Sequence, residues 1–519
     1  MKKIKFLLID IGYICEELNE PLGIEVLGNY LHTNSPEVDT KIYSANIETL
    51  DYYTLLRREN PDVIGISTHI NTWDRLRKLY NICCEFYAEY KKNPIFLIGG
   101  ILGTYEYERI LVEFQNAICI IGEGEEALSR LLNMMIDIQK LNYLNLITKI
   151  RNDSCPNLAY LYMESINITE RSCLPHLSKI EENVEHQYLD MVIQKRGIVR
   201  MEASRGCPWN ACSFCVLQWK YAGKGWRPYS INKVIREMIQ LSSKGAKTIY
   251  FTDEEFIAGS YGRLEEMVNR ISEAKKSGLL DNDLEFIAST SVQALRGEYG
   301  IEKDIIENLL INMRHIGFRS FFLGLESGSN SQLKRFKKGA SVAESEEVLK
   351  LLKRCGIEAD IGYILFDPMV SLAELKESLE FLKRNSLNEH ISRFAKRLRL
   401  VPHTPFCSYR GIIFENHDFN FVEINYKFSD KSVQRVYDLY SSWEKEHLKI
   451  THTLQAEIRE ARSSQERNEK IAVLEEIRKQ EFMVLDCLVD TAIEKPTDLD
   501  NASILAGLLS RGSMKDTDY

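Results

Sequence analysis

Three cysteines that lie close together give the strongest chemical signal in the sequence. Cys207, Cys212 and Cys215 fall within nine residues, directly after the apolar segment 199–203, which is predicted to be a strand. Thiolates at this spacing can bind one inorganic cluster, and three of them would leave one iron of a 4Fe-4S cluster without a protein ligand. An open iron of this kind can bind a substrate or a cofactor directly.

Two other interpretations of these cysteines remain open. A zinc site would need a fourth His or Cys ligand, and zinc ligands usually come as two spaced pairs, whereas no second pair follows here. An incidental group of buried cysteines is the second alternative, since the other nine cysteines are scattered and lie mostly in apolar segments, as core thiols do. An iron–sulfur cluster fits the spacing best.

Length and composition limit the class of protein. The 519 residues suffice for several domains, because single cores seldom grow past about 250–300 residues. The longest apolar runs, such as 95–98, are too short to cross a bilayer. Asp10 and Gly12 interrupt the apolar N-terminal run before a signal-peptide core could form, so we expect a cytoplasmic protein with no membrane partner. A net charge of −9 argues against nucleic acid as a partner.

Residues 1–135 alternate short β-rich runs with longer helical patterns, which predicts an α/β fold with a doubly wound, Rossmann-like parallel sheet. The predicted strands are 4–9, 41–44, 63–67, 95–98 and 118–121. Ligands of such sheets bind beyond the carboxyl ends of the strands. The residues expected there are Ser67, Thr68, His69, Gly99, Gly100, Gly122, Glu123 and Gly124. Each glycine pair taken alone is also consistent with simple loop closure.

The rest of the chain divides into three parts. Residues 136–197 show weak periodicity and are predicted to form a linker, with one short packed strand at 157–160. Residues 198–405 contain six strand–helix units, which predicts a partial (β/α)6 TIM barrel whose polar residues gather at the strand C-termini. The predicted strands are 199–203, 248–252, 284–288, 320–325, 360–366 and 396–401. Residues 406–519 are predicted to form a helical domain.

The cysteine segment resembles that of the radical S-adenosylmethionine (SAM) superfamily. The usual CxxxCxxC pattern is here Cx4CxxC, a departure shared with cobalamin-associated branches, and Phe214 precedes the third cysteine as in the family. The resemblance implies a 4Fe-4S cluster on the three cysteines, with SAM chelated by the open iron. Electron transfer into the sulfonium would then release a 5'-deoxyadenosyl radical.

Polar residues at the ends of the predicted barrel strands match other segments of that superfamily. The carbonyls of Asp253 and Glu254 would meet the methionyl amino group. The hydroxyls of Ser289 and Ser291 would suit a carboxylate or a ribose hydroxyl. Glu326 lies in a segment that resembles the family's GxESGS motif beside the nucleoside. A single Glu at a strand end is also consistent with a cap or a salt bridge.

The N-terminal module resembles the cobalamin-binding domain that precedes the cluster domain in cobalamin-dependent members. The match runs through 20–25, 61–67, Gly99-Gly100 and 121–128. The DxHxxG motif is absent, so the resemblance implies a cofactor bound with its dimethylbenzimidazole tail released and no histidine on cobalt. His69 could reach the lower face, although a lone histidine there is more often a hydrogen-bonded loop residue.

We therefore expect a radical SAM methyltransferase that transfers methyl from methylcobalamin to an unactivated carbon of a natural-product intermediate or peptide. A non-methylating radical reaction, such as oxidation, ring contraction or cyclisation, is the alternative. The family also implies a reducing partner such as flavodoxin or ferredoxin. A methylthiotransferase fits less well, because the N-terminal module lacks three further cluster cysteines. A non-catalytic cobalamin sensor fits less well, because all three cysteines of the 207–215 segment are present.

Overall fold

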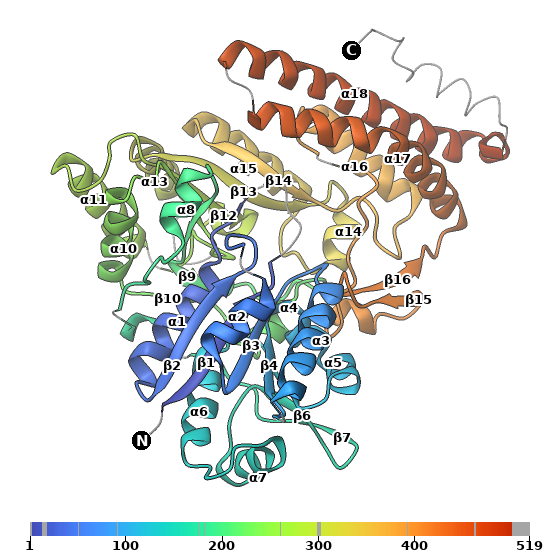
Figure 1. Cartoon of the computed structure of the whole chain (residues 1–519). Helices are drawn as coiled ribbons and strands as arrows, with labels where there is room; N and C mark the ends of the chain where they lie inside the picture. The colour runs from blue at the N-terminus through green and yellow to red at the C-terminus, as the bar shows by residue number, and fades with distance from the viewer. Residues whose placement is uncertain are drawn as a thin grey trace.

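Runs of Val, Ile and Leu bounded by polar turns form a seven-stranded sheet in the N-terminal part of the chain (Figure 1). The computed structural model describes residues 3–12, 18–49, 51–90, 92–174, 176–180, 182–259, 261–297, 303–391, 393–460 and 463–500. The strand order is β2-β1-β3-β4-β5-β6-β7. The strands are β1 (Ile4–Asp10), β2 (Val38–Ser44), β3 (Val63–Thr68), β4 (Ile95–Gly99), β5 (Ala117–Ile120), β6 (Leu158–Tyr162) and β7 (Ser165–Ile168).

The first five strands are parallel, so the predicted doubly wound α/β fold is confirmed. The strands β6 and β7 add an antiparallel edge to this sheet. They lie within 136–197, where only a linker with one short packed strand was expected. Ile120 of β5 lies opposite Leu158 of β6, and the amide of Ile121 donates to the carbonyl of Asn157 at 2.8 Å, which joins this segment to the sheet.

Helices cover both faces of the sheet, because alternate residues of each strand point to opposite sides. Phe6 and Leu8 of β1 belong to a core shared with α1 and α6, whereas Leu7 and Ile9 belong to a core shared with α2, α3 and α5. The helices of this unit are α1 (Leu22–Asn34), α2 (Tyr52–Glu59), α3 (Trp73–Glu89), α4 (Gly100–Tyr105), α5 (Tyr107–Glu113), α6 (Glu125–Ile136) and α7 (Tyr143–Asp153).

The second unit is a five-stranded parallel sheet with the order β14-β13-β12-β11-β8. Its strands are β8 (Val199–Met201), β11 (Thr248–Phe251), β12 (Glu285–Ser291), β13 (Phe318–Glu326) and β14 (Glu358–Tyr363). Its helices are α8 (Leu189–Gln194), α9 (Leu217–Lys220), α10 (Ile231–Ser243), α11 (Tyr261–Lys276), α12 (Val292–Leu295), α13 (Lys303–His315), α14 (Asn330–Arg335), α15 (Val342–Cys355) and α16 (Leu372–Arg384). The short strands β9 (Ser204–Arg205) and β10 (Arg227–Pro228) pair beside it.

The sixth predicted strand, 396–401, is irregular. It makes one parallel bridge, between Phe366 and Arg397, beyond the end of β14 at Tyr363. Its backbone forms hydrogen bonds with two different segments. The amide of Leu398 donates to the carbonyl of Phe366, and the carbonyl of Leu400 accepts from the amide of Ile424. A regular ladder therefore does not form at this end of the partial barrel.

The C-terminal part is mainly a pair of long helices, α17 (Lys431–Glu460) and α18 (Ser464–Glu494), of which α18 packs on α16 (Figure 1). Before them lies a hairpin, β15 (Ile413–Asp418) and β16 (Glu423–Lys427), where only helices were expected. The hairpin turn contacts the first unit through Asn420, whose carbonyl and side chain accept from the backbone of Asn71 and Trp73. Short 3-10 turns lie at Leu177–Lys179, Asn388–His390, Pro405–Ser408 and Pro496–Asp500.

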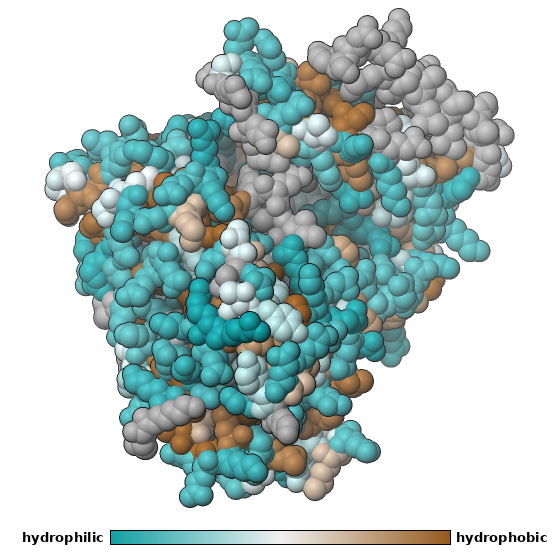
Figure 2. Space-filling view, in the orientation of Figure 1, coloured by the Kyte–Doolittle hydropathy of each residue, from teal (hydrophilic) through white to brown (hydrophobic). Residues whose placement is uncertain are grey.

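The surface in this view is mainly hydrophilic, with scattered hydrophobic patches (Figure 2). Among the residues that the structure describes, no helix is both long enough and apolar enough to cross a membrane.

The two α/β units meet closely at a glycine turn, which generates a prediction. Gly122 has a φ of +82°, and a Cβ there would lie 2.3 Å from the carbonyl oxygen of Lys220. We expect Gly122→Ala to lower the free energy of unfolding by more than about 1 kcal/mol, because both the backbone conformation and the contact exclude a methyl group. Urea denaturation would measure this loss.

Gly23 supplies the matched control for this experiment. It lies in α1, and a Cβ there would meet no heavy atom within 4 Å. Gly23→Ala should preserve or raise stability, by roughly 0.5–1 kcal/mol, because Ala has the higher helix propensity. Equal denaturation midpoints for the two variants would contradict the close contact at Gly122.

Candidate functional site

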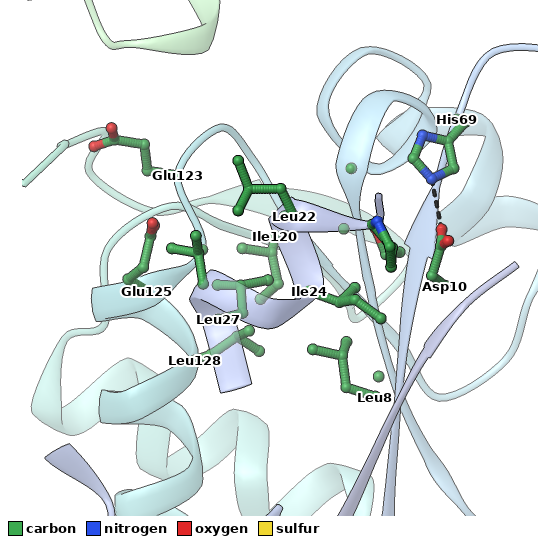
Figure 3. Close-up of a pocket in the computed structure, with 18 of the residues that line it drawn as sticks. Leu8, Asp10, Leu22, Ile24, Leu27, His69, Ile120, Glu123, Glu125 and Leu128 are labelled. Atoms are coloured by element: carbon green, nitrogen blue, oxygen red, sulfur yellow. Dashed lines mark hydrogen bonds and ion pairs between the residues drawn. The ribbon is translucent and has the colours of Figure 1, made fainter. Parts of the chain in front are cut away.

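A cavity lies where the carboxyl edge of the first sheet faces the second unit (Figure 3). Seven of the eight residues predicted at that edge line it: Ser67, His69, Gly99, Gly100, Gly122, Glu123 and Gly124. Arg205, Lys220 and Thr252 of the second unit line the same cavity. Leu8, Leu27, Ile120 and Leu128 give it an apolar wall (Figure 3).

Thr68 is the eighth predicted residue, and it does not line the cavity. Its side chain forms hydrogen bonds with the backbone instead. Its hydroxyl donates to the carbonyl of Gly99 at 2.6 Å and accepts from the amide of Leu102 at 3.0 Å. Gly100 lies against the same residue, since a Cβ there would be 2.2 Å from the carbonyl oxygen of Thr68. Thr68 therefore fixes the start of α4, and only a glycine can stand at position 100.

His69 lies at the cavity wall with its ring held by Asp10 (Figure 3). The distance between His69 Nε2 and Asp10 Oδ1 is 2.5 Å, and Asp10 Oδ2 also accepts from the hydroxyl of Ser44. The Nε2 atom of His69 is thus engaged by a carboxylate that comes from β1.

Glu123 is part of a buried ion network that joins the two units. Its Oε1 accepts from Arg205 Nη1 and from Arg227 Nη2, each at 3.1 Å, and its Oε2 accepts from the amide of Leu174 at 2.8 Å. Arg205 also pairs with Glu125 at 2.7 Å and with Glu202 at 3.0 Å. We call Glu123, Glu125, Glu202, Arg205 and Arg227 the Arg205 network.

The surroundings of Glu123 and Arg205 favour the charged form of both side chains. Burial alone would raise the pKa of Glu123, but Arg205 and Arg227 outweigh burial and hold that pKa below its usual value. Burial likewise would lower the pKa of Arg205, whereas its carboxylates, first Glu125 and Glu202, hold it well above the usual value. Glu123 thus serves as an ionic link, although its side chain lies at the cavity edge where a ligand contact was predicted.

The cysteine loop follows β9 and is anchored by its backbone. Gly206 opens the loop with a φ of +85°, and the amide of Cys215 donates to the carbonyl of Cys212 at 3.1 Å. The amide of Ser213 donates to Phe336, and the ring of Phe214 makes an edge contact with the same phenylalanine. The loop is therefore fixed on the segment after α14.

The three thiols are free and lie near one another. Burial raises the pKa of Cys212 to about 12 and that of Cys215 to about 11, and the charge of Cys207 contributes to both shifts. A site that gathers three thiols beside a buried cation suits an anionic iron–sulfur cluster, whose binding would displace the thiol protons.

That cation is Lys338, which the sequence did not single out. Its ammonium is buried and donates to Glu326 Oε1 at 3.2 Å. Burial alone would lower the pKa of Lys338, but Glu326 and the thiols of Cys212 and Cys207 raise it to about 12. Glu326 has a φ of +71° at an irregularity in the pairing of β13 with β14, so its backbone is held in an uncommon conformation.

Asp253 and Glu254 hold the backbone that leads into the cysteine loop. Asp253 is buried and accepts from the amide of Ala203 at 2.9 Å, and burial raises its pKa to about 8. Glu254 accepts from the amide of Gly206 at 2.8 Å and from Lys220 Nζ at 2.9 Å. Their side chains therefore support the loop, and their carbonyls were the groups predicted to meet a ligand.

The same strand end carries a third carboxylate, Glu255, which the sequence did not single out. Glu255 is fully buried and accepts from the hydroxyl of Thr290 at 2.8 Å, while its Oε2 has no hydrogen-bond partner among the described residues. Burial raises the pKa of Glu255 to about 7. Ser289 accepts from the amide of Phe256 through its carbonyl, and the hydroxyl of Ser291 caps α12.

The variant Thr68→Val tests whether Thr68 has a structural role or contacts a ligand. The buried amide of Leu102 would lose its acceptor, so we expect a loss of about 1–3 kcal/mol in the free energy of unfolding. Cobalamin affinity of the folded fraction should stay unchanged. Ser67→Ala is the control, since Ser67 lines the cavity and should change stability by less than about 0.5 kcal/mol. Weaker cobalamin binding with unchanged stability in Thr68→Val would contradict this assignment.

The pH dependence of the stability of Glu123→Gln tests the ionic link between the two units. At pH 7 we expect a loss of about 3 kcal/mol, because removal of one partner leaves buried guanidinium charge uncompensated. Since the folded pKa of Glu123 is below its usual 4.5, wild type loses this stabilisation as the pH falls through that lower value, and the difference between the proteins shrinks. Urea denaturation midpoints of the two proteins between pH 7 and about pH 2.5 measure this difference.

Glu126→Gln is the matched control for the pH series. Glu126 pairs with Arg130 at the surface of α6, so its loss should cost less than about 1 kcal/mol. A gap between wild type and Glu123→Gln that widens as the pH falls would contradict the ionic link.

Two family models match the chain, and together they span more than half of it. The model "Radical SAM superfamily" matches residues 201–382, and the model "B12 binding domain" matches residues 14–132. The first range contains the three cysteines and Lys338, and the second contains the glycine edge of the cavity.

Two relatives and one solved structure are similar to the chain. The 4'-phospho-dehydrooxetanocin synthase of Priestia megaterium is 27% identical over 338 residues, which are 62% of this chain but only 43% of that relative. An uncharacterized methyltransferase of Pyrococcus horikoshii is 25% identical over 400 residues, 74% of this chain and 79% of that relative. The structure of the cobalamin-dependent S-adenosylmethionine radical enzyme OxsB with aqua-cobalamin and S-adenosylmethionine bound has a TM-score of 0.81 at 18% identity, covering 99% of this chain and 76% of that one, which shows a shared fold.

The residues present fit the cofactors of the matched families. Three free thiols beside Lys338 suit a 4Fe-4S cluster with SAM, and a glycine-lined edge with an apolar wall suits the large, flat cobalamin. The expected cofactors, namely a 4Fe-4S cluster, SAM and cobalamin, are confirmed by the family matches. The chain belongs to the cobalamin-dependent radical SAM enzymes.

Proposed function

We propose that the chain is a methyltransferase that places a methyl group from cobalamin on an unactivated carbon of a biosynthetic substrate, a natural-product intermediate or a peptide. The observation that carries the proposal is a cavity lined by both units, with Gly100 and Gly122 on one side and Arg205 and Thr252 on the other. A methyl donor at the first edge and a radical source at the second would face the same substrate. Holding them together replaces a diffusional encounter by a fixed approach.

When bound, the cluster and SAM supply the adenosyl radical and cobalamin supplies the methyl group. The chain's own residues hold and shield these groups. Cys207, Cys212 and Cys215 would hold the cluster, while the Lys338 ammonium stabilises negative charge beside them. The apolar wall, with Leu8 and Ile120, excludes water from the cavity that a reactive carbon radical would occupy.

A second candidate function is a radical reaction without methylation. The relative from Priestia megaterium carries the name of a synthase, and it is the one with 27% identity, whereas the relative from Pyrococcus horikoshii carries the name of a methyltransferase. The two functions differ in their products, because methyl transfer from SAM leaves S-adenosylhomocysteine, whereas reductive cleavage leaves 5'-deoxyadenosine. A flavodoxin or a ferredoxin would serve as the reductant in either case.

The proposal predicts the products of the loaded wild-type enzyme and of cysteine variants. After anaerobic reconstitution with iron, sulfide and hydroxocobalamin, wild type should form both 5'-deoxyadenosine and S-adenosylhomocysteine from SAM under reducing conditions. Cys207→Ser, Cys212→Ser and Cys215→Ser should each lose the cluster absorbance and the deoxyadenosine. Cys355→Ser is the control, because Cys355 lies at the end of α15, and it should keep both products.

Mass spectrometry of the two nucleosides distinguishes the outcomes. Deoxyadenosine without S-adenosylhomocysteine, with cobalamin bound, would favour the non-methylating reaction. A cluster that survives in all three variants would overturn the assignment of the metal ligands.

A further inference from the structure

A second group of possible metal ligands lies apart from the cysteine loop, at the junction of three parts of the chain. Glu20 precedes α1, His186 lies between β7 and α8, and Glu25 lies in the first turn of α1. One ligand atom from each of the three lies within 4.8 Å of the others. His186 Nδ1 is 2.7 Å from Glu20 Oε1, although the two residues are 166 positions apart.

The group is buried and its geometry is fixed by backbone amides. The side chains of Glu20 and His186 are 0% and 1% exposed. Glu20 Oε2 accepts from the amide of Arg200 at 2.8 Å, and Glu25 Oε1 accepts from the amide of Tyr188 at 2.9 Å. One oxygen of each carboxylate is thus anchored, while Glu20 Oε1 faces His186 Nδ1 and Glu25 Oε2 has no hydrogen-bond partner among the described residues.

Two buried atoms of the group lack hydrogen bonds. Glu25 Oε2 and His186 Nε2 have no hydrogen-bond partner among the described residues, and Glu25 as a whole is 1% exposed. A buried carboxylate oxygen without a partner is costly, and such an atom in a native structure calls for an unseen ligand. Both atoms belong to residues whose side chains are ordinary ligands of divalent metal ions.

The charges around the group also favour a cation. Glu237 of α10 lies 3.5 Å from His186 Nε2, and it is already paired with Lys233 at 2.6 Å. Three carboxylates, those of Glu20, Glu25 and Glu237, thus lie together with one ammonium and one imidazole. This set is rich in the oxygen ligands that divalent metal ions take.

A polar hollow reaches Glu25, although Glu20 and His186 do not line it. Glu25 lines it together with Asn29, His32, Thr40, Glu185 and Gln187. The hydroxyl of Thr40 also lacks a hydrogen-bond partner among the described residues. The hollow therefore offers an entry path and polar partners for water ligands, which a metal ion held by only three side chains needs.

We propose that Glu20, Glu25 and His186 bind one divalent transition-metal ion, such as Zn²⁺ or Mn²⁺, which ties α1 to the segment before α8. The ion would have a structural role. Glu20 lies next to Pro21 and Leu22, which line the cofactor cavity, so the ion would also fix that wall. This site is independent of the proposed methyl transfer.

Mn²⁺ binding to the reconstituted enzyme tests the proposal. With the cluster and cobalamin loaded, the cysteine loop is occupied, and the loss of the free Mn²⁺ EPR signal reports the new site. We expect one Mn²⁺ per chain for wild type and an affinity at least about tenfold weaker for Glu25→Gln and His186→Gln. Added Zn²⁺ should displace the bound Mn²⁺.

Glu185→Gln is the matched control, because Glu185 is exposed, lines the same hollow and is adjacent to His186 in the chain. It should bind Mn²⁺ as wild type does. Equal binding by wild type, Glu25→Gln and His186→Gln would overturn the proposal, as would an equal loss in Glu185→Gln.

Metal analysis of wild type covers the case in which the variants fail to fold. The protein is purified from cells grown with zinc and manganese, dialysed, and analysed for metals other than iron and cobalt. One equivalent of zinc or manganese would support the site. A wild-type protein that holds neither metal and removes no Mn²⁺ from solution would overturn it.

Discussion

The buried Arg205 network is the interaction on which the arrangement of the two units depends. Arg205 stands two residues before Cys207, and Glu123 stands one residue after Gly122. The ion pair between them, at 3.1 Å, joins the edge of one sheet to the loop after the other. Because both partners are desolvated, the pair has little freedom to re-form elsewhere, and it fixes which faces of the two units meet.

The consequence of this link is a single cavity with two chemically different sides. On the side of the first sheet, glycines and aliphatic residues leave room for a broad ligand, and Thr68 keeps the α4 turn in place from behind. On the other side, Arg205, Lys220 and Thr252 of the second unit line the cavity. The thiols, with Lys338 and Glu326 beside them, are not part of this lining, and Glu254 connects the two by accepting from the amide of Gly206 at the start of the cysteine loop and from Lys220. Neither unit alone contains both the donors for a metal cluster and the space for a large planar cofactor.

Much of this architecture could be predicted from the sequence, because its signals are local. The five parallel strands of the first sheet are short apolar runs between turns, and the cysteine motif is contained in nine residues. The hairpin β15–β16 was missed because its strands are short and lie largely exposed on a helical, charged background. The sixth barrel strand was predicted as regular, yet its hydrogen bonds divide between Phe366 and Ile424, which local periodicity cannot reveal.

The side-chain roles that escaped prediction depend on partners far away in the chain. Glu123 was expected to contact a ligand, but its guanidinium partner Arg205 is 82 positions away. Lys338 stands next to Lys337 and so has the sequence signature of a surface pair, whereas the fold buries it beside the thiols. The Glu20–His186 contact likewise forms only when a segment beyond the first sheet returns to α1.

The central claim is that cobalt and the iron–sulfur cluster face each other across one cavity. The most direct test is the microwave power saturation of the cob(II)alamin EPR signal in the fully loaded enzyme, recorded with the cluster oxidised and then reduced. A reduced, paramagnetic cluster close to cobalt should accelerate the relaxation of the cob(II)alamin signal and raise its saturation power. An identical saturation curve in both cluster states would mean that the two cofactors are magnetically isolated, and it would contradict the shared cavity.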